Sequence, residues 1–199
     1  LLISLILISC GETNKLENIN NILLFGDSLM SGYGLKEDQT LSIILENDLK
    51  KAGYNIKIIN GSVSGDTSED GLDRIEEYTS GGDIDLIVLG LGANDMLRRI
   101  NPDQTESNLR KIIEIIKTKN IKIILAGMKA SPTNGLAYKK KFDDIFPKLA
   151  EEYDLTLIPF LLKKVALNPK LNQSDGIHPN FEGAKVISET IKESIINFD

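Results

Sequence analysis

Short, continuous apolar runs alternate with amphipathic stretches along the chain from Asn21 onward. A run such as Leu86-Ile87-Val88-Leu89 is apolar on both of its side-chain faces, which is typical of a parallel strand buried on both sides. A stretch such as 105–118 instead spaces its apolar residues three and four positions apart, as in a helix with one buried face. Repeated strand–helix units of this length favour an α/β fold, an open parallel sheet with helices on both faces.

This alternation predicts about five strands and about five longer helices. The predicted strands are 22–25, 56–59, 86–89, 121–126 and 155–158, and the predicted helices are 40–52, 68–78, 105–118, 138–153 and 181–196. All of them fall in one expected domain, residues 21–199. A chain of 199 residues is long enough for one well-filled core, and no internal repeat divides it.

The composition excludes some classes of partner. The chain is 41% hydrophobic and 26% charged, which is ordinary for a soluble globular domain. Its net charge of −6 leaves no excess of Lys and Arg to replace the counterions of a phosphate backbone, so nucleic acid is not an expected partner. The acidic residues Asp66, Glu69, Asp70 and Asp73 do not have the spacing of a calcium loop, so a solvated helix start is the favoured interpretation.

The first residues differ in character from the rest of the chain. Residues 1–9 form an apolar run that is too short to span a bilayer but has the length of the hydrophobic part of a signal peptide. Leu7-Ile8-Ser9-Cys10-Gly11 resembles the lipobox of bacterial lipoproteins, in which the cysteine becomes the lipidated N-terminus. Residues 10–20 are then interpreted as a lipidated cysteine and a polar tether, which predicts a periplasmic or cell-surface lipoprotein anchored to a membrane. The alternative is a buried N-terminal segment in which Cys10, the only cysteine, is incidental.

In an open parallel sheet, ligands bind in the crevice beyond the carboxyl ends of the strands. The segments that follow the predicted strands are therefore the ones to inspect for a site. They are 26–28, 60–66, 90–95, 127–135 and the loop that ends at His178. All of these segments are expected to open on one edge of the sheet.

One of these loops carries the only histidine of the chain, His178, three residues after Asp175. A serine hydroxyl is a weak nucleophile until a base removes its proton, and imidazole suits that role near neutral pH. The imidazole in turn needs a carboxylate on its other nitrogen to fix its tautomer and orientation. Ser28, just after the first predicted strand, is the candidate nucleophile, with His178 as base and Asp175 as orienting carboxylate. The G-x-S-x-G elbow of the α/β-hydrolases is absent, and Asp27 is interpreted as a loop-organising residue.

Acyl transfer also needs hydrogen-bond donors at the developing oxyanion. Gly65 lacks a Cβ, so a substrate can approach its backbone N–H closely. Asn94 offers a carboxamide N–H, and the backbone N–H of Ser28 is a third candidate. Each residue alone also has a structural explanation. These explanations are a helix cap for Ser28, an Asx turn for Asn94, a positive φ for Gly65 and acceptance of loop N–H groups for Asp175.

At these positions the sequence resembles a known family. Gly26-Asp27-Ser28-Leu29 is similar to the GDSL nucleophile block, and Ser64-Gly65-Asp66-Thr67-Ser68 is similar to the glycine block. Gly92-Ala93-Asn94-Asp95 is similar to the GxND block, and residues 175–180 are similar to the DxxH block. Together these are the four blocks of the SGNH, or GDSL, hydrolases, in the family's order. The most similar branch is that of the bacterial arylesterases and the thioesterase I and lysophospholipase group.

The resemblance implies a flavodoxin-like, three-layer αβα fold with a parallel sheet of about five strands. It also implies a triad of Ser28, His178 and Asp175, and an oxyanion hole formed by Ser28, Gly65 and Asn94. No metal and no cofactor are implied. The implied substrates are small or medium acyl esters, with thioesters and lysophospholipids as further candidates.

The loop after the fourth predicted strand lines the acyl site in this branch. Here it keeps Pro132, Asn134 and Gly135, which are the expected substrate-binding residues, but it lacks the aromatic residue of the branch. Two alternatives remain open at this point. One is an O-acetylesterase that uses the same triad on carbohydrate or peptidoglycan, and the other is a lipoprotein that captures a ligand without turnover. The oligomeric state is open, and a monomer is favoured.

Overall fold

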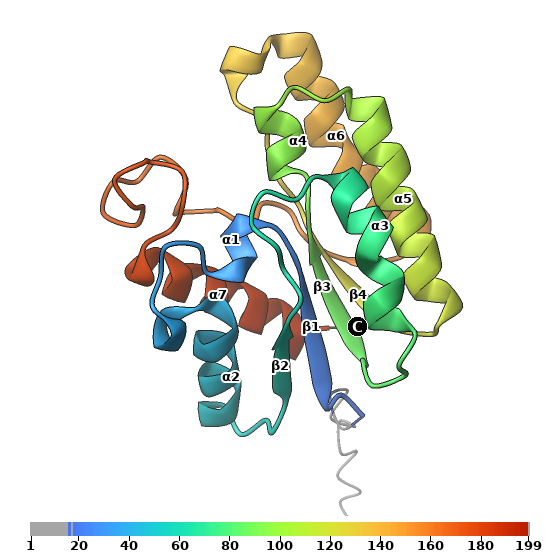
Figure 1. Cartoon of the computed structure of the whole chain (residues 1–199), viewed down its shortest axis with the longest axis vertical. Helices are drawn as coiled ribbons and strands as arrows, with labels where there is room; N and C mark the ends of the chain where they lie inside the picture. The colour runs from blue at the N-terminus through green and yellow to red at the C-terminus, as the bar shows by residue number, and fades with distance from the viewer. Residues whose placement is uncertain (1–15, 17, 199) are drawn as a thin grey trace, which may run out of the picture.

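The computed structural model describes residue 16 and residues 18–198, and its centre is a parallel sheet of five strands (Figure 1). In chain order the strands are β1 (Asn21–Gly26), β2 (Lys57–Asn60), β3 (Leu86–Gly90), β4 (Lys122–Ala126) and β5 (Thr156–Ile158). Their order across the sheet is β2-β1-β3-β4-β5, and every neighbouring pair is parallel. The strand order therefore changes direction between β1 and β3, which is where an open sheet forms a crevice for ligands.

Helices cover both faces of the sheet (Figure 1). α2 (Leu41–Lys51) and α7 (Phe181–Ile196) lie on one face, and α3 (Ser68–Thr79), α5 (Pro102–Thr118) and α6 (Leu136–Tyr153) cover the other. The shorter helical segments are α1 (Ser28–Ser31), α4 (Ala93–Leu97), and the 3₁₀ turns η1 (Glu37–Gln39) and η2 (Pro132–Asn134). The predicted three-layer αβα fold is confirmed.

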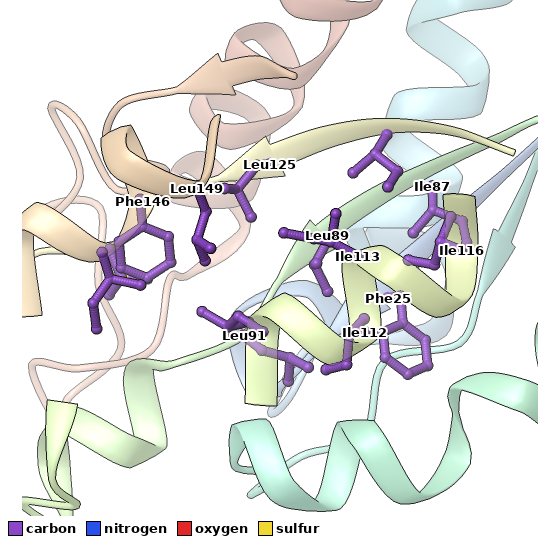
Figure 2. Close-up of a cluster of buried hydrophobic side chains, with 14 of the residues drawn as sticks. Phe25, Ile87, Leu89, Leu91, Ile112, Ile113, Ile116, Leu125, Phe146 and Leu149 are labelled. Atoms are coloured by element: carbon purple, nitrogen blue, oxygen red, sulfur yellow. The ribbon is translucent and has the colours of Figure 1, made fainter. Parts of the chain in front are cut away.

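The strands supply apolar side chains to both faces because successive strand residues point in opposite directions. In β1, Leu23 and Phe25 pack on the side of α3 and α5, whereas Ile22 and Leu24 pack on the side of α2 and α7. All four side chains are fully buried. Figure 2 shows the first of these two cores, in which Ile113 and other apolar residues of α5 lie against the sheet. The continuous apolar runs of the sequence thus reflect burial on both faces.

The five predicted strands are confirmed, with each end shifted by one residue at most. The largest shift of a helix end is in α5, which begins at Pro102, three residues before the predicted start. Its first turn is polar, so the apolar spacing does not reach it. Asn101 caps this turn by accepting a hydrogen bond from the backbone N–H of Asp103, and proline fits the first helical position.

The packed part of the chain begins before Asn21, so the predicted tether over residues 10–20 is too long. Leu16 and Ile19 are buried in the core on the side of α2 and α7. The backbone N–H of Ile19 donates to the carbonyl of Leu16 at 3.0 Å. The predicted signal segment and Cys10 lie outside the described residues. Among the helices in the described part of the chain, none is long and apolar enough to cross a membrane.

Candidate active site

Ser28 lies directly beyond β1, at the first residue of the short helix α1. Asp27 caps this helix, because its Oδ1 accepts a hydrogen bond from the backbone N–H of Leu29 at 3.0 Å. The loop-organising role predicted for Asp27 is confirmed, and the helix cap is Asp27 rather than Ser28. A side chain at Gly26 would not fit this turn, since a Cβ there would lie 2.6 Å from the carbonyl oxygen of Gly90. Glycine thus allows β1 to run close to β3 just before the nucleophile candidate.

A hydrogen-bonded chain joins Asp175, His178 and Ser28, although Ser28 and His178 are 150 residues apart in the sequence. His178 Nδ1 lies 2.7 Å from Asp175 Oδ2, and His178 Nε2 lies 3.1 Å from Ser28 Oγ. A carboxylate only accepts hydrogen bonds, so Nδ1 carries the hydrogen and Nε2 accepts one from the serine hydroxyl. The structure therefore brings the three predicted triad residues together in the arrangement that base catalysis requires.

The Asp175 carboxylate also accepts hydrogen bonds from the backbone of its own loop. Its Oδ1 accepts hydrogen bonds from the backbone N–H groups of Ile177, at 2.9 Å, and His178, at 3.0 Å. The hydrogen bond from the His178 ring, followed by these two backbone bonds, lowers the pKa of Asp175 to about 2. The carboxylate is therefore ionised throughout the neutral range, as an orienting partner of imidazole must be.

Two residues that the sequence did not single out support the His178 ring. The ring of Tyr33 packs against it, with 4.4 Å between the centroids and an angle of 40° between the planes. Gln173 Nε2 donates to the carbonyls of Tyr33 and Pro179, at 2.8 and 3.0 Å. Gly34 leaves room for this side chain, because a Cβ there would lie 2.3 Å from Gln173 Oε1. The only sequence signal for Tyr33 was its place between two glycines just after the nucleophile turn.

The Gly65 segment is held against the nucleophile turn. Gly65 has a φ of +93°, a left-handed conformation that favours glycine. The backbone N–H of Val63 donates to the carbonyl of Gly26 at 3.0 Å, and Ser64 Oγ lies 2.8 Å from Ser31 Oγ in α1. These bonds join the loop after β2 to the end of β1 and to α1, so the predicted donor Gly65 lies on the same edge as Ser28.

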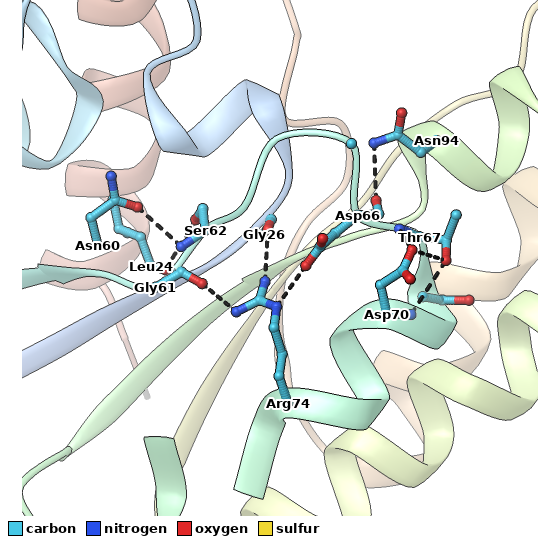
Figure 3. Close-up of polar contacts among 12 residues, drawn as sticks. Leu24, Gly26, Asn60, Gly61, Ser62, Asp66, Thr67, Asp70, Arg74 and Asn94 are labelled. Atoms are coloured by element: carbon cyan, nitrogen blue, oxygen red, sulfur yellow. Dashed lines mark hydrogen bonds and ion pairs between the residues drawn. The ribbon is translucent and has the colours of Figure 1, made fainter. Parts of the chain in front are cut away.

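Asn94 reaches this loop from α4. Its Nδ2 donates to the carbonyl oxygen of Asp66 at 2.9 Å (Figure 3). This bond fixes which end of the carboxamide is the nitrogen, and it uses one of the two amide hydrogens. Among the described residues, no acceptor takes the other hydrogen. The contact is with a residue 28 positions away, so the local Asx turn considered for Asn94 does not explain its side chain.

The neighbouring residue Asp95 anchors α4 to α3 and α5. It is fully buried, and its Oδ2 accepts a hydrogen bond from the backbone N–H of Ser68 at 2.8 Å. Its Oδ1 accepts from Ser68 Oγ at 2.5 Å and from Thr105 Oγ1 at 3.0 Å. Asn108 completes the network by donating to Ser68 Oγ at 3.1 Å. The sequence did not reveal this network, because its members come from three separate helices.

The acidic residues at positions 66, 69, 70 and 73 do not form one cluster, because they have different surroundings. Asp66 Oδ2 forms an ion pair with Arg74 Nε at 2.6 Å. Asp70 forms a capping box with Thr67 at the start of α3, and the hydrogen bonds from Thr67 lower the pKa of Asp70. The other two acidic side chains of the group are exposed. The predicted helix start is thus confirmed for Asp70, while Asp66 belongs to a buried ion pair.

The loop expected to bind the acyl group is attached to α4. Asn134 Nδ2 donates to the carbonyl of Met96 at 2.8 Å, and Pro132 and Asn134 form the 3₁₀ turn η2. Gly135 follows with a φ of +94° and leads into α6. Within the described residues, no hydrogen bond or ring contact joins this loop to the triad. The structure therefore places Pro132, Asn134 and Gly135 beside α4, while their contact with a substrate stays a prediction.

Among the described residues, most of the large exposed apolar side chains lie on segments at this edge of the sheet. Of the large apolar residues that are substantially exposed, five lie on segments that follow strands β1 to β4 or on the triad loop. They are Tyr33, Val63, Leu97, Leu136 and Ile177, with exposed fractions from 44% to 80%. Apolar side chains exposed on the segments that carry a polar site are typical of a surface that receives an apolar ligand.

The chain is similar to known hydrolases over most of its length. Residues 24–186 match the GDSL-like lipase/acylhydrolase family. An arylesterase of Vibrio mimicus is 34% identical over 98% of this chain and 97% of its own. A protein of Escherichia coli K12 named thioesterase 1/protease 1/lysophospholipase L1 is 35% identical over 88% of this chain and 83% of its own.

A solved structure shares the same fold. The psychrotrophic esterase EstA from a Pseudoalteromonas species, in a structure inhibited by monoethylphosphonate, superposes with a TM-score of 0.85 and is 28% identical. The match covers 90% of this chain and 98% of EstA. The likeness in fold therefore extends over most of both chains.

Proposed function

Because the chain belongs to the GDSL-like lipase and acylhydrolase family, we propose that it hydrolyses small or medium acyl esters with Ser28 as nucleophile. Thioesters and lysophospholipids extend the proposed range, since one relative carries both activities in its name. The observation that carries the proposal is the hydrogen-bonded chain from Asp175 through His178 to Ser28. Such a chain activates a serine that would otherwise be a poor nucleophile.

In the proposed first half of the reaction, His178 Nε2 takes the proton from Ser28 Oγ as that oxygen attacks the acyl carbon. The carbonyl oxygen becomes negatively charged, and N–H groups of Ser28, Gly65 and Asn94 stabilise it. Asp175 stabilises the imidazolium that forms. His178 then gives its proton to the departing alcohol or thiol, and the acyl group remains on Ser28.

The second half releases the acyl group. His178 removes a proton from water, the water oxygen attacks the acyl carbon, and the proton returns to Ser28 Oγ as the carboxylic acid leaves. The exposed apolar residues around the site support an acyl group as the part of the substrate that the protein holds.

The proposal is tested by turnover of p-nitrophenyl esters from acetyl to decanoyl. Wild-type protein is expected to hydrolyse part of this series, and Ser28→Ala to lose roughly 10³-fold or more in kcat, as when a nucleophile is removed. Equal inactivity of the two proteins across the series would refute the esterase function. Turnover confined to acetylated xylan or acetylated peptidoglycan would instead favour the O-acetylesterase alternative.

We also propose that the mature protein begins at a lipidated Cys10 and works at a periplasmic or cell-surface membrane. The lipobox-like residues 7–11 support this location. The buried Leu16 leaves only a short polar segment between the proposed anchor and the packed domain. The anchor is therefore expected to hold the domain close to its membrane.

A further inference from the structure

A partly buried arginine contacts the loop that carries the candidate oxyanion donor Gly65. Arg74 of α3 has a side chain that is only 15% exposed, and its Nε forms the 2.6 Å ion pair with Asp66, whose side chain is 11% exposed. The guanidinium also lies over the ring of Phe25, 4.0 Å from its centroid. Removing such a charge from water is costly unless its hydrogen bonds are satisfied, so its partners indicate what the residue is for.

The other two nitrogens of Arg74 bind backbone carbonyls on two different loops (Figure 3). Nη1 donates to the carbonyl of Gly61 at 2.5 Å, at the exit of β2. Nη2 donates to the carbonyl of Gly26 at 3.1 Å, at the end of β1 and two residues before Ser28. One planar group therefore ties the nucleophile turn to both ends of the 61–66 loop.

Asp66 connects Arg74 to two of the candidate oxyanion donors, the backbone N–H of Gly65 and the carboxamide of Asn94. It follows Gly65 directly, and its backbone N–H donates to the carbonyl of Val63 at 3.2 Å. Its own carbonyl accepts the hydrogen bond from Asn94 Nδ2. A shift of Asp66 would move the Gly65 N–H and the Asn94 carboxamide together, relative to the end of β1 that Arg74 also holds.

We propose that Arg74 is a positioning residue that sets the distance of Gly65 and Asn94 from Ser28, and so the strength of the oxyanion hole. This inference rests on the proposed esterase function. The hydrogen bonds point in three directions from one rigid, planar fork, which a lysine cannot reproduce because its ammonium is a single point of charge on a flexible stem. A small displacement of donors reduces stabilisation of the transition state more than it reduces substrate binding.

The alternative is that Arg74 only stabilises the fold, and the chain offers a matched control for that case. Arg110 joins α5 to α6 through ion pairs with Glu106, at 3.0 Å, and Glu152, and it also donates to the hydroxyl of Tyr153. It is likewise a partly buried arginine with several partners, but it has no contact with the candidate site in the described structure. Arg110→Lys therefore shows how losing the guanidinium of a purely structural arginine changes the stability and the turnover of the enzyme.

The experiment compares wild type, Arg74→Lys, Asp66→Asn and Arg110→Lys. Measured quantities are kcat and KM for the best p-nitrophenyl ester, the midpoint of thermal unfolding, and inhibition by a trifluoromethyl ketone with the same acyl chain. Ser28 Oγ adds to the carbonyl carbon of this ketone, and the serine proton passes to His178. The adduct carries its negative charge on the former carbonyl oxygen, so its stability reports on the oxyanion hole.

Arg74→Lys and Asp66→Asn are each expected to lower kcat by roughly 10- to 100-fold while KM changes by less than about threefold. Inhibition by the ketone is expected to weaken by about the same factor as kcat/KM. Arg110→Lys is expected to lower the unfolding midpoint but to keep kcat within about twofold of wild type.

Three results obtained with folded variants would overturn the inference. The first is a kcat of Arg74→Lys that equals that of wild type. The second is an equal fall in kcat in Arg110→Lys at the same loss of stability. The third is ketone inhibition that is as strong in Arg74→Lys as in wild type. If both site variants fail to fold while Arg110→Lys folds, Arg74 acts through stability and the inference is also lost. An inactive wild-type protein would instead refute the proposed function itself.

Discussion

Asp27 is a fully buried carboxyl group directly beside Ser28. Its Oδ1 caps α1, but its Oδ2 has no hydrogen-bond partner in the described part of the chain. Burial, followed by the nearby carboxylate of Asp95, raises its pKa from the ordinary 3.8 to about 7. Asp27 is therefore expected to gain or lose its proton near neutral pH, next to the nucleophile.

This raised pKa predicts a specific dependence of stability on pH. Between about pH 4 and pH 7 the folded protein holds a proton on Asp27 that the unfolded chain has lost, so folding is favoured less as the pH rises through this range. Asp27→Asn cannot titrate. Its free energy of unfolding relative to wild type is expected to rise by up to roughly 4 kcal/mol from pH 4 to pH 8. Urea unfolding of both proteins at several pH values measures this difference, and parallel curves would contradict the prediction.

The pKa of Asp175 is shifted in the opposite direction to that of Asp27. Because its pKa is about 2, it is ionised wherever the enzyme is assayed near neutrality. Asp175→Asn would offer the His178 Nδ1 an amide in place of a carboxylate, which disturbs the tautomer. We expect kcat for the best ester to fall by roughly 10³- to 10⁴-fold.

A surface aspartate provides the control for this change. Asp144 forms an exposed ion pair with Lys140 on α6, away from the triad loop. Asp144→Asn should leave kcat unchanged, since exposed pairs of this kind contribute little. If Asp175→Asn retained activity within about threefold of wild type, His178 would not depend on its carboxylate partner.

At the level of elements, α4 is positioned by one buried side chain. Asp95 accepts three hydrogen bonds, two of which come from Ser68 and one from Thr105. Asp95→Asn would replace one acceptor oxygen with an NH₂ group that faces donors. We expect a loss of about 2 to 4 kcal/mol in the free energy of unfolding, together with lower kcat because Asn94 shifts with α4.

A similar aspartate at the opposite edge of the sheet separates these two effects. Asp85 Oδ2 accepts hydrogen bonds from the backbone N–H groups of Asn20 and Asn21, at 2.8 and 2.9 Å. Asp85→Asn should cost stability without changing kcat, as measured by urea unfolding and ester turnover. An unchanged kcat in Asp95→Asn, as expected for Asp85→Asn, would contradict the proposed coupling of α4 to Asn94.

Most helices and strands could be predicted, because the buried face of each one gives its segment a characteristic spacing of apolar residues. β3 is apolar throughout, and α7 spans the residues 181–196 over which the sequence predicts the last helix. α1 and α4 have only four and five residues, which is too short for a periodic pattern. They follow strands at the site, where the chain turns for function rather than to cover a core.

The candidate catalytic residues could be predicted from the sequence, but the residues that hold them in place could not. Ser28, Asp175 and His178 stand out because few residue types can perform their roles. Arg74 does not, since two of its three partners are backbone carbonyls, and every residue in the chain has one. The packing of Tyr33 on His178 likewise depends on how two distant loops meet in space.

On the scale of the whole molecule, the site and the start of the described chain lie at opposite edges of the sheet. Ser28, which His178 contacts, follows the carboxyl end of β1, whereas Leu16 and Ile19 precede its amino end. An anchor at Cys10 would hold the amino edge toward the membrane, and the site would face away from it.

Lipidation at Cys10 is tested by expressing the full-length gene product in a bacterium that is fed a labelled fatty acid. The wild-type protein should incorporate the label and partition into detergent, and Cys10→Ser should do neither. Both proteins should keep the same kcat on a soluble ester, because residue 10 precedes the amino edge. A wild-type protein that stays unlabelled and soluble would exclude the anchor.

The central claim is that His178 and Asp175 make Ser28 a nucleophile. Reaction with a fluorophosphonate followed by peptide mass spectrometry tests it most directly, because fluoride leaves as Oγ bonds to phosphorus. The account predicts a single adduct on the peptide that contains Ser28, its absence in Ser28→Ala, and much slower labelling in His178→Ala. An unlabelled wild-type protein, or a Ser28→Ala protein labelled as fully as wild type, would contradict it.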